Sequence, residues 1–274
     1  MKRRPIAALV YDFDGTLSPG SMQQHTLLPE MAYSNPGEFW RQVKEINREV
    51  NGDEILTYMQ HLVSVFGEAL TKERFREHEK QLPFFDGVEQ WFPRINAFAT
   101  ERGLALEHYI VSSGLEELIE GCSIRKHFRH VFASKYAYKD GKACWPAIAI
   151  NYTGKTQYLF RINKGVLNSW DDIAVNRWIP MEERPLPFQR MIFVGDGDTD
   201  IPAMKMLRHQ GGASIAVFDP AQFSGPNSQK VYNLIAEDRA TYVCPADYSH
   251  GSQLDVVVKG SLGRFARDAG YRPR

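Results

Sequence analysis

Hydrophobic and polar positions form two alternating kinds of segment along most of the chain. Four short runs are apolar at nearly every position, which is typical of strands in a parallel sheet that is covered on both faces. These runs are residues 6–11, 108–112, 190–195 and 214–218. Other segments place apolar residues at helical spacing, namely 86–103, 114–122, 163–178 and 200–210. The alternation predicts an open α/β sheet.

Residues 19–84 follow a different pattern, with helical spacing throughout and no strand-like run. They are predicted to form a helical insert between the first strand and the next strand–helix unit. Residues 130–145 are predicted to form a hairpin, because an Asp-Gly turn signal separates two aromatic-rich runs. The stretches 179–187 and 219–230 contain prolines and are predicted to be loops.

Composition limits the classes of function. With 43% hydrophobic residues, the 274-residue chain can bury a sizeable core. Lys+Arg and Asp+Glu are both 33, so no overall basic field attracts nucleic acid. We expect no membrane partner, because no uncharged apolar run approaches the roughly 18 residues of a membrane helix. The three cysteines are far apart and form no CxxC, which favours reduced thiols and a cytoplasmic protein. The sequence does not indicate an oligomeric state.

Two groups of acidic residues follow predicted strands. Asp12 and Asp14 end the first strand, and Asp196, Asp198 and Asp200 follow the third. Ligands of open parallel sheets bind at the carboxyl ends of the strands, so these distant groups can converge. Carboxylates held close together need a cation, and oxygen ligands without His or Cys favour Mg²⁺. The sequence therefore predicts a magnesium site at this edge.

A phosphate site is predicted at the same edge. Residues 111–114 (VSSG) end another strand with hydroxyls and a glycine just before a helix, where N–H groups and the positive helix end favour an anion. A lysine would neutralise a bound phosphate. Lys164, at the start of a predicted helix, is preferred over Lys155.

Each of these features also has a purely structural explanation. Asp-x-Asp can cap a turn, the serines can cap a helix, and a lone lysine is usually solvated. A calcium loop is excluded for residues 196–200, because Ile201 stands where that loop requires glycine. The functional interpretation rests on the conjunction of all four features, in order, at predicted strand ends or helix starts.

The four features together resemble the ordered motifs of the haloacid dehalogenase (HAD) superfamily of hydrolases. They are Asp12-x-Asp14, the serine motif at 111–114, Lys164 and the acidic group at 196–200. The insert resembles the cap of phosphoserine-phosphatase-like members, and the predicted hairpin resembles the one that follows their second motif.

The resemblance implies a Rossmann-like parallel-sheet HAD core, built from residues 1–18 and 85–274. It also implies an inserted all-helical cap domain of residues 19–84. The cap of such proteins closes over the site, so the leaving group of the substrate would contact residues of this segment.

The resemblance also assigns roles to the acidic residues. Asp12 would be the nucleophile, forming a phosphoaspartate, and a ligand of Mg²⁺. Asp14 would protonate the leaving oxygen, then activate water, and bind the metal through its backbone carbonyl. Asp196 would bind the metal directly, and Asp200 through water or by orienting other ligands. Asp198 is expected to cap a helix or to be solvated.

The remaining motifs are assigned to phosphate binding. By the resemblance, Ser112 and the N–H of Ser113 or Gly114 would hold phosphate oxygens. Lys164 would neutralise both the phosphate and Asp12.

The implied function is a Mg²⁺-dependent phosphatase that acts on a small phosphorylated metabolite. Asp14 argues against carbon–halogen cleavage, because a departing halide needs no proton. A phosphotransferase or phosphomutase, and a non-catalytic phosphate-binding relative, remain alternatives. Ser21 stands where phosphoserine phosphatases have a glutamate, so phosphoserine is not the expected substrate. The polar candidates for leaving-group contacts in the insert are Gln23, Gln24, His25 and Arg48.

Overall fold

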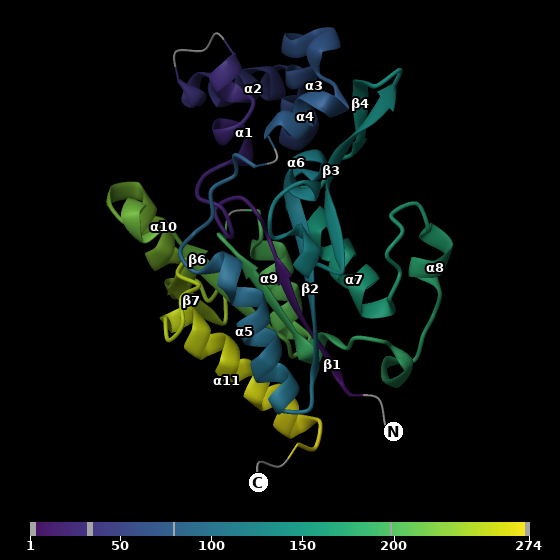
Figure 1. Ribbon diagram of the computed structural model, residues 1–274, viewed down its shortest axis with the longest axis vertical. Helices are drawn as coiled ribbons and strands as arrows, with labels where there is room; N and C mark the ends of the chain where they lie inside the picture. The colour runs from purple at the N-terminus through teal and green to yellow at the C-terminus, as the bar shows by residue number, and fades with distance from the viewer. Residues whose placement is uncertain (1–3, 32–34, 79, 198, 272–274) are drawn as a thin grey trace.

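The computed structural model describes residues 4–31, 35–78, 80–197 and 199–271 (Figure 1). Within these ranges a seven-stranded sheet has the order β4-β3-β2-β1-β5-β6-β7. The strands are β1 (Ile6–Tyr11), β2 (Ala105–Leu115), β3 (His130–Lys139), β4 (Lys142–Ile148), β5 (Met191–Gly195), β6 (Ala213–Phe218) and β7 (Tyr242–Pro245). Only the β3–β4 pair of these strands is antiparallel. The predicted α/β sheet is confirmed.

Helices cover both faces of the sheet. Ala7, Leu9 and Tyr11 of β1 belong to one apolar core, and Ala8 and Val10 to the other, all with no exposed surface. Because successive side chains of a strand point to opposite faces, this double burial explains the continuous apolar run. The helices of the core are α5 (Val88–Glu101), α6 (Glu116–Glu120), α7 (Gly154–Lys164), α8 (Asp172–Asn176), α9 (Ile201–His209), α10 (Gly225–Ala236) and α11 (Gln253–Asp268).

The helical insert lies at one end of the molecule, beside the tip of the β3–β4 hairpin (Figure 1). Its α-helices are α1 (Met22–His25), α2 (Pro36–Val50), α3 (Glu54–Phe66) and α4 (Lys72–His78). The N–H of Ala143 donates to the carbonyl of Leu70 (2.8 Å), and Tyr136 Oη donates to the carbonyl of Met59 (2.8 Å). The insert is therefore hydrogen-bonded directly to the hairpin.

Three parts of the structure differ from the sequence prediction. The helix predicted over 163–178 is wrong, because α7 ends at Lys164. Gly165 follows it in the left-handed conformation (φ +71°), which ends a helix and favours glycine. The predicted loop at 219–230 is wrong in its second half, where α10 begins at Gly225. The elements β7 and α11 were not predicted.

All three cysteines are free, with Cys122 and Cys244 buried and Cys144 exposed. Among the described residues, no helix is both long and apolar enough to span a membrane.

Candidate active site

Three of the predicted acidic residues meet at the carboxyl ends of β1 and β5. Asp12 directly follows β1, and its N–H donates to the carbonyl of Val194 in β5 (2.9 Å). One carboxylate oxygen from each of Asp12, Asp196 and Asp200 lies within 4.8 Å of the others. Because β1 and β5 are parallel neighbours, residues that end these strands meet at one edge. The structure thus brings together side chains from distant parts of the sequence.

Lys155 links two of these carboxylates. Its Nζ donates to Asp12 Oδ2 (2.6 Å) and Asp200 Oδ1 (2.7 Å), and its side chain has no exposed surface. Burial raises the pKa of both carboxyls, and the ammonium of Lys155 opposes that rise. Burial alone would lower the pKa of Lys155, but the two carboxylates outweigh it and raise the pKa. Lys155 is therefore a buried, permanently charged ammonium.

The structure places Lys164 away from this site, so the preference for Lys164 over Lys155 is wrong. Its Nζ donates to the carbonyls of Val175 (2.6 Å) and Arg177 (2.8 Å). The sequence pattern predicts a helix that begins near residue 163, whereas α7 ends at Lys164. Lys164 therefore lies at the opposite end of the helix from the one that faces the site. Lys155 lies in the first turn and Lys164 in the last, about 14 Å apart along the axis at 1.5 Å per residue.

Asp14 lies beside the cluster, in a turn made possible by Gly15 (φ +67°). Its Oδ1 accepts a hydrogen bond from the N–H of Met22 (2.9 Å), the first residue of α1. Burial, and then the charge of Asp12, raise the pKa of Asp14 well above its ordinary value. A carboxyl with a raised pKa is suited to act as a general acid. Its side chain is not one of the three clustered carboxylates, so a metal contact would use the backbone carbonyl.

The serine motif ends β2, which pairs directly with β1. Ser112 is buried, and its Oγ accepts a hydrogen bond from the N–H of Gly114 (3.0 Å). The Oγ of Ser113 is buried without a hydrogen-bond partner among the described residues. A Cβ built on Gly114 would lie 3.2 Å from Asp14 Oδ2 and collide with Met22. The motif is therefore adjacent to Asp14, as a shared site requires.

A second lysine reaches the cluster from α10. Lys230 Nζ lies 3.3 Å from Asp196 Oδ2, and both side chains are 32% exposed. Sequence reasoning missed Lys230, because it stands in a polar segment that was predicted to be a loop and carries no motif. Asp198, expected to be a capping or solvated residue, lies outside the described residues.

The three clustered carboxylates fit a magnesium ion. Their donor set consists of oxygen atoms alone, which hard divalent cations prefer. Three negative charges against the two positive charges of Lys155 and Lys230 leave a net attraction for a cation. The residues present therefore match the metal that the motifs imply.

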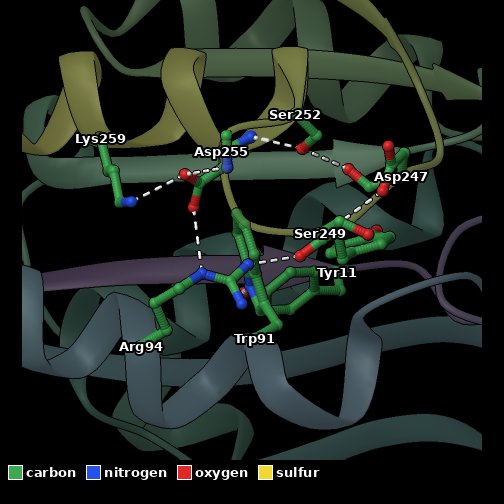
Figure 2. Close-up of polar contacts among 10 residues, drawn as sticks. Tyr11, Trp91, Arg94, Asp247, Ser249, Ser252, Asp255 and Lys259 are labelled. Carbon is green, nitrogen blue, oxygen red and sulfur yellow. Dashed lines mark hydrogen bonds and ion pairs between the residues drawn. The ribbon is translucent and has the colours of Figure 1, made fainter.

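A polar network connects α5 and α11 with the loop of the first motif, and Figure 2 shows its contacts among Arg94, Asp255 and Lys259. Tyr248 is fully buried, and its Oη donates to the carbonyl of Thr16 (2.9 Å). The guanidinium of Arg94 in α5 donates to the carbonyl of Tyr248 and to Asp255 Oδ1 (3.3 Å). Lys259 in α11 donates to Asp255 Oδ2 (2.7 Å). Through Tyr248, the helices α5 and α11 thus hold the backbone of Thr16, two residues after Asp14.

Comparison with known proteins supports the resemblance seen in the motifs. A family model described as haloacid dehalogenase-like hydrolase matches residues 9–205. A protein of Borreliella burgdorferi described as uncharacterized is 28% identical over 284 residues, which cover 92% of this chain and 95% of that protein.

Solved structures of this family share the fold. A HAD family hydrolase from Salmonella enterica serovar Typhi has a TM-score of 0.59 at 13% identity, covering 94% of this chain and 72% of that one. A phosphoserine phosphatase, solved as a phospho-aspartyl intermediate analogue, has a TM-score of 0.54 at 18% identity and covers 94% and 99%. At these identities the likeness concerns the fold.

Proposed function

The chain belongs to the haloacid dehalogenase-like hydrolase family, and we propose that it is a Mg²⁺-dependent phosphatase acting on a small phosphorylated metabolite. The observation that carries this proposal is the pairing of Asp12, held by a buried lysine, with Asp14, whose pKa is raised. The first residue suits a nucleophile, and the second suits an acid that protonates a leaving oxygen.

In the proposed first step, a carboxylate oxygen of Asp12 attacks phosphorus. The bond from phosphorus to the ester oxygen breaks, and that oxygen takes the proton of Asp14. In the second step, the Asp14 carboxylate removes a proton from water as the water oxygen attacks the phosphoaspartate. The bond from phosphorus to Asp12 then breaks, which releases inorganic phosphate and regenerates Asp12.

Phosphate binding is assigned to the serine motif and Lys155. Because Ser112 Oγ accepts from the N–H of Gly114, its own O–H is able to donate to a phosphate oxygen. The N–H of Ser113 is the further proposed donor. Lys155 takes the role that the motifs had given to Lys164, since its ammonium already contacts Asp12.

Magnesium is assigned to the carboxylates of Asp12, Asp196 and Asp200, with the backbone carbonyl of Asp14 as a further ligand. When bound, it would neutralise charge on the phosphoryl oxygens during transfer. The cytoplasm is the proposed compartment, because the three cysteines are free thiols.

The proposal is tested with an aryl phosphate such as 4-nitrophenyl phosphate. We expect turnover with Mg²⁺, loss of turnover with EDTA, and loss to the background rate in Asp12→Asn. Steady hydrolysis by Asp12→Asn would refute the proposal. Faster transfer of phosphate to an added alcohol than to water would instead identify a phosphotransferase. Tight binding of phosphate analogues, with no turnover of a broad ester panel, would identify a non-catalytic relative.

A further inference from the structure

A pocket of about 160 Å³ adjoins Asp196 and lies between the first-motif turn and α10. We propose that it is a leaving-group subsite, for a phosphate ester whose leaving group combines a ring-sized apolar body with a second anionic group. This inference rests on the proposed function and names its substrate class. The second anion is a carboxylate or a phosphate, and Lys230 is the residue that would bind it.

The position of the pocket connects it to the proposed general acid. Gly15 and Gly20 line the pocket, and the N–H of Gly15 donates to the carbonyl of Gly20 (3.0 Å), which closes the turn that follows Asp14. A Cβ built on Gly15 would lie 3.0 Å from Asp196 Oδ2, and one on Gly20 would collide with Gln24. Gly15, the residue that follows Asp14, therefore forms part of the pocket wall with backbone alone, directly beside Asp196.

The apolar part of the pocket fits a single ring. Phe85, Phe218 and Phe223 line it, and the rings of Phe218 and Phe223 are tilted against each other with centroids 4.9 Å apart. A cavity of about 150 Å³ is large enough to hold benzene. Phe223 is 39% exposed, so a bound ring would cover apolar surface that water now contacts.

The polar part of the pocket offers hydrogen-bond donors on its α10 side, next to the carboxylates of Asp196 and Asp219. Lys230 and Asn227 line it from α10, and each carries a hydrogen-bond donor. The pocket also contains Asp219, but its Oδ1 accepts from the N–H of Ala221 (2.9 Å) and its Oδ2 from Gln222 Nε2 (2.9 Å). Its carboxylate is thus already engaged within its own turn.

Lys230 now contacts Asp196, a proposed metal ligand. A divalent cation on Asp196 would weaken this ion pair, because it neutralises the carboxylate that attracts the ammonium. We expect the ammonium to contact an anionic group of the substrate when the cation is bound. The two binding events are expected to be coupled, with Mg²⁺ favouring the anionic leaving group.

The test compares 4-carboxyphenyl phosphate with the neutral isostere 4-carbamoylphenyl phosphate. We expect the wild type to have the higher kcat/KM for the acid, and Lys230→Met to lower the acid-to-amide ratio about tenfold, since a charge-assisted hydrogen bond is lost. Lys205→Met removes an exposed lysine of α9 and should keep the wild-type ratio. The same kcat/KM ratio is then measured with 1,4-phenylene bisphosphate in place of 4-carboxyphenyl phosphate. The larger of the two ratios shows whether the subsite prefers a phosphate or a carboxylate.

Two outcomes overturn the subsite: equal kcat/KM for acid and amide in the wild type, or the same ratio in Lys230→Met and Lys205→Met. A readout without turnover separates this failure from failure of the proposed function. Calorimetry should show that 4-hydroxybenzoate binds to the wild type more tightly with Mg²⁺ than with EDTA, and that binding weakens in Lys230→Met. If the protein binds 4-hydroxybenzoate in this way but hydrolyses no phosphate ester, the subsite is supported and the proposed phosphatase activity is refuted. If 4-hydroxybenzoate does not bind in this way, the subsite is refuted.

Discussion

Lys155 touches two carboxylates of the site and has no contact with solvent. Removal of its charge in Lys155→Met leaves Asp12 and Asp200 buried without a cation. We expect a loss of about 3 kcal/mol in the free energy of unfolding without metal, because breaking a buried ion pair strands its partners. We also expect loss of aryl phosphate turnover. Urea unfolding with EDTA and a steady-state assay with Mg²⁺ measure the two effects.

Lys164→Met is the matched control for this prediction. Lys164 donates to two backbone carbonyls outside the site, so its loss should cost about 1 kcal/mol and leave turnover near that of the wild type. If Lys164→Met abolished turnover and Lys155→Met did not, the assignment of the two lysines would be reversed.

A second prediction concerns His108, a buried residue of β2. Tyr11 Oη accepts from Trp91 Nε1 (2.8 Å), so its own proton is donated to His108 Nδ1 (3.1 Å). The other ring nitrogen, Nε2, then carries the proton that Asn96 Oδ1 accepts (3.1 Å). The imidazole is therefore neutral, and burial lowers the pKa of His108 to about 3.

The sign of the pH effect follows from the unfolded state, where a histidine has a pKa of about 6.5. Between pH 6.5 and 3 the unfolded chain binds a proton that the folded chain does not, so stability falls as the pH falls. At pH 5.5 the loss from His108 is about 1.4 kcal/mol. Urea unfolding at pH 7.5 and 5.5 should show a smaller pH effect in His108→Gln than in the wild type. An equal effect in both proteins would contradict the neutral buried imidazole.

At the scale of elements, α5 and α11 are joined through Asp255, which is only 2% exposed. Burial alone would raise the pKa of Asp255, but hydrogen bonds from Lys259 and the N–H of Gly251 outweigh it and the pKa is lowered. Asp255→Ala should lower the free energy of unfolding by about 3 kcal/mol, since Arg94 and Lys259 lose a buried partner. Chemical denaturation measures this loss.

The exposed pair at the end of the same helix provides the control. Arg267 and Asp268 are both more than half exposed, so Asp268→Ala should change stability by less than about 1 kcal/mol. Similar losses in both variants would show that burial does not decide the value of the Asp255 contacts.

The elements that the sequence predicts well are those with continuous apolar runs, because strands buried on both faces need them. The strand β7 has four residues, of which Tyr242 is 42% exposed, so it leaves no such run. The ends of helices are harder to predict, because helical spacing of apolar residues can continue past the last residue of a helix, as it does after Lys164. The apolar spacing predicts a helix that begins near residue 163 and contains Gly165. In the structure Gly165 ends α7, so Lys155, and not Lys164, lies in the first turn of that helix.

The carboxylates of the site could be predicted because each follows a strand whose carboxyl end the sheet topology places. Lys155 was the less favoured alternative, and only the position of α7 distinguishes it from Lys164. Lys230 could not be predicted, since its approach to Asp196 depends on how α10 packs against the core. Local sequence carries no information about that packing.

At the scale of the whole molecule, three of the proposed reacting groups are buried where the helical insert meets the core. Asp12 is 4% exposed, and Lys155 and Ser112 are not exposed at all. We expect substrate entry to involve separation of the insert from the core. Tyr58 of α3 bridges the two, because its Oη donates to the carbonyl of Ser113 (2.9 Å).

Tyr58→Phe removes this bridge without changing the size of the buried ring. The free-energy difference between closed and open forms should fall by about 1 kcal/mol, the net value of one hydrogen bond. Amides of α3 that exchange through this opening should then exchange with deuterium about fivefold faster, because exchange follows the open population. Mass spectrometry of α3 peptides measures this. Tyr232→Phe, an exposed tyrosine of α10, is the matched control. Unchanged exchange in α3 would mean that closure depends on the apolar packing of the insert and on the hairpin contacts of Leu70 and Tyr136 instead.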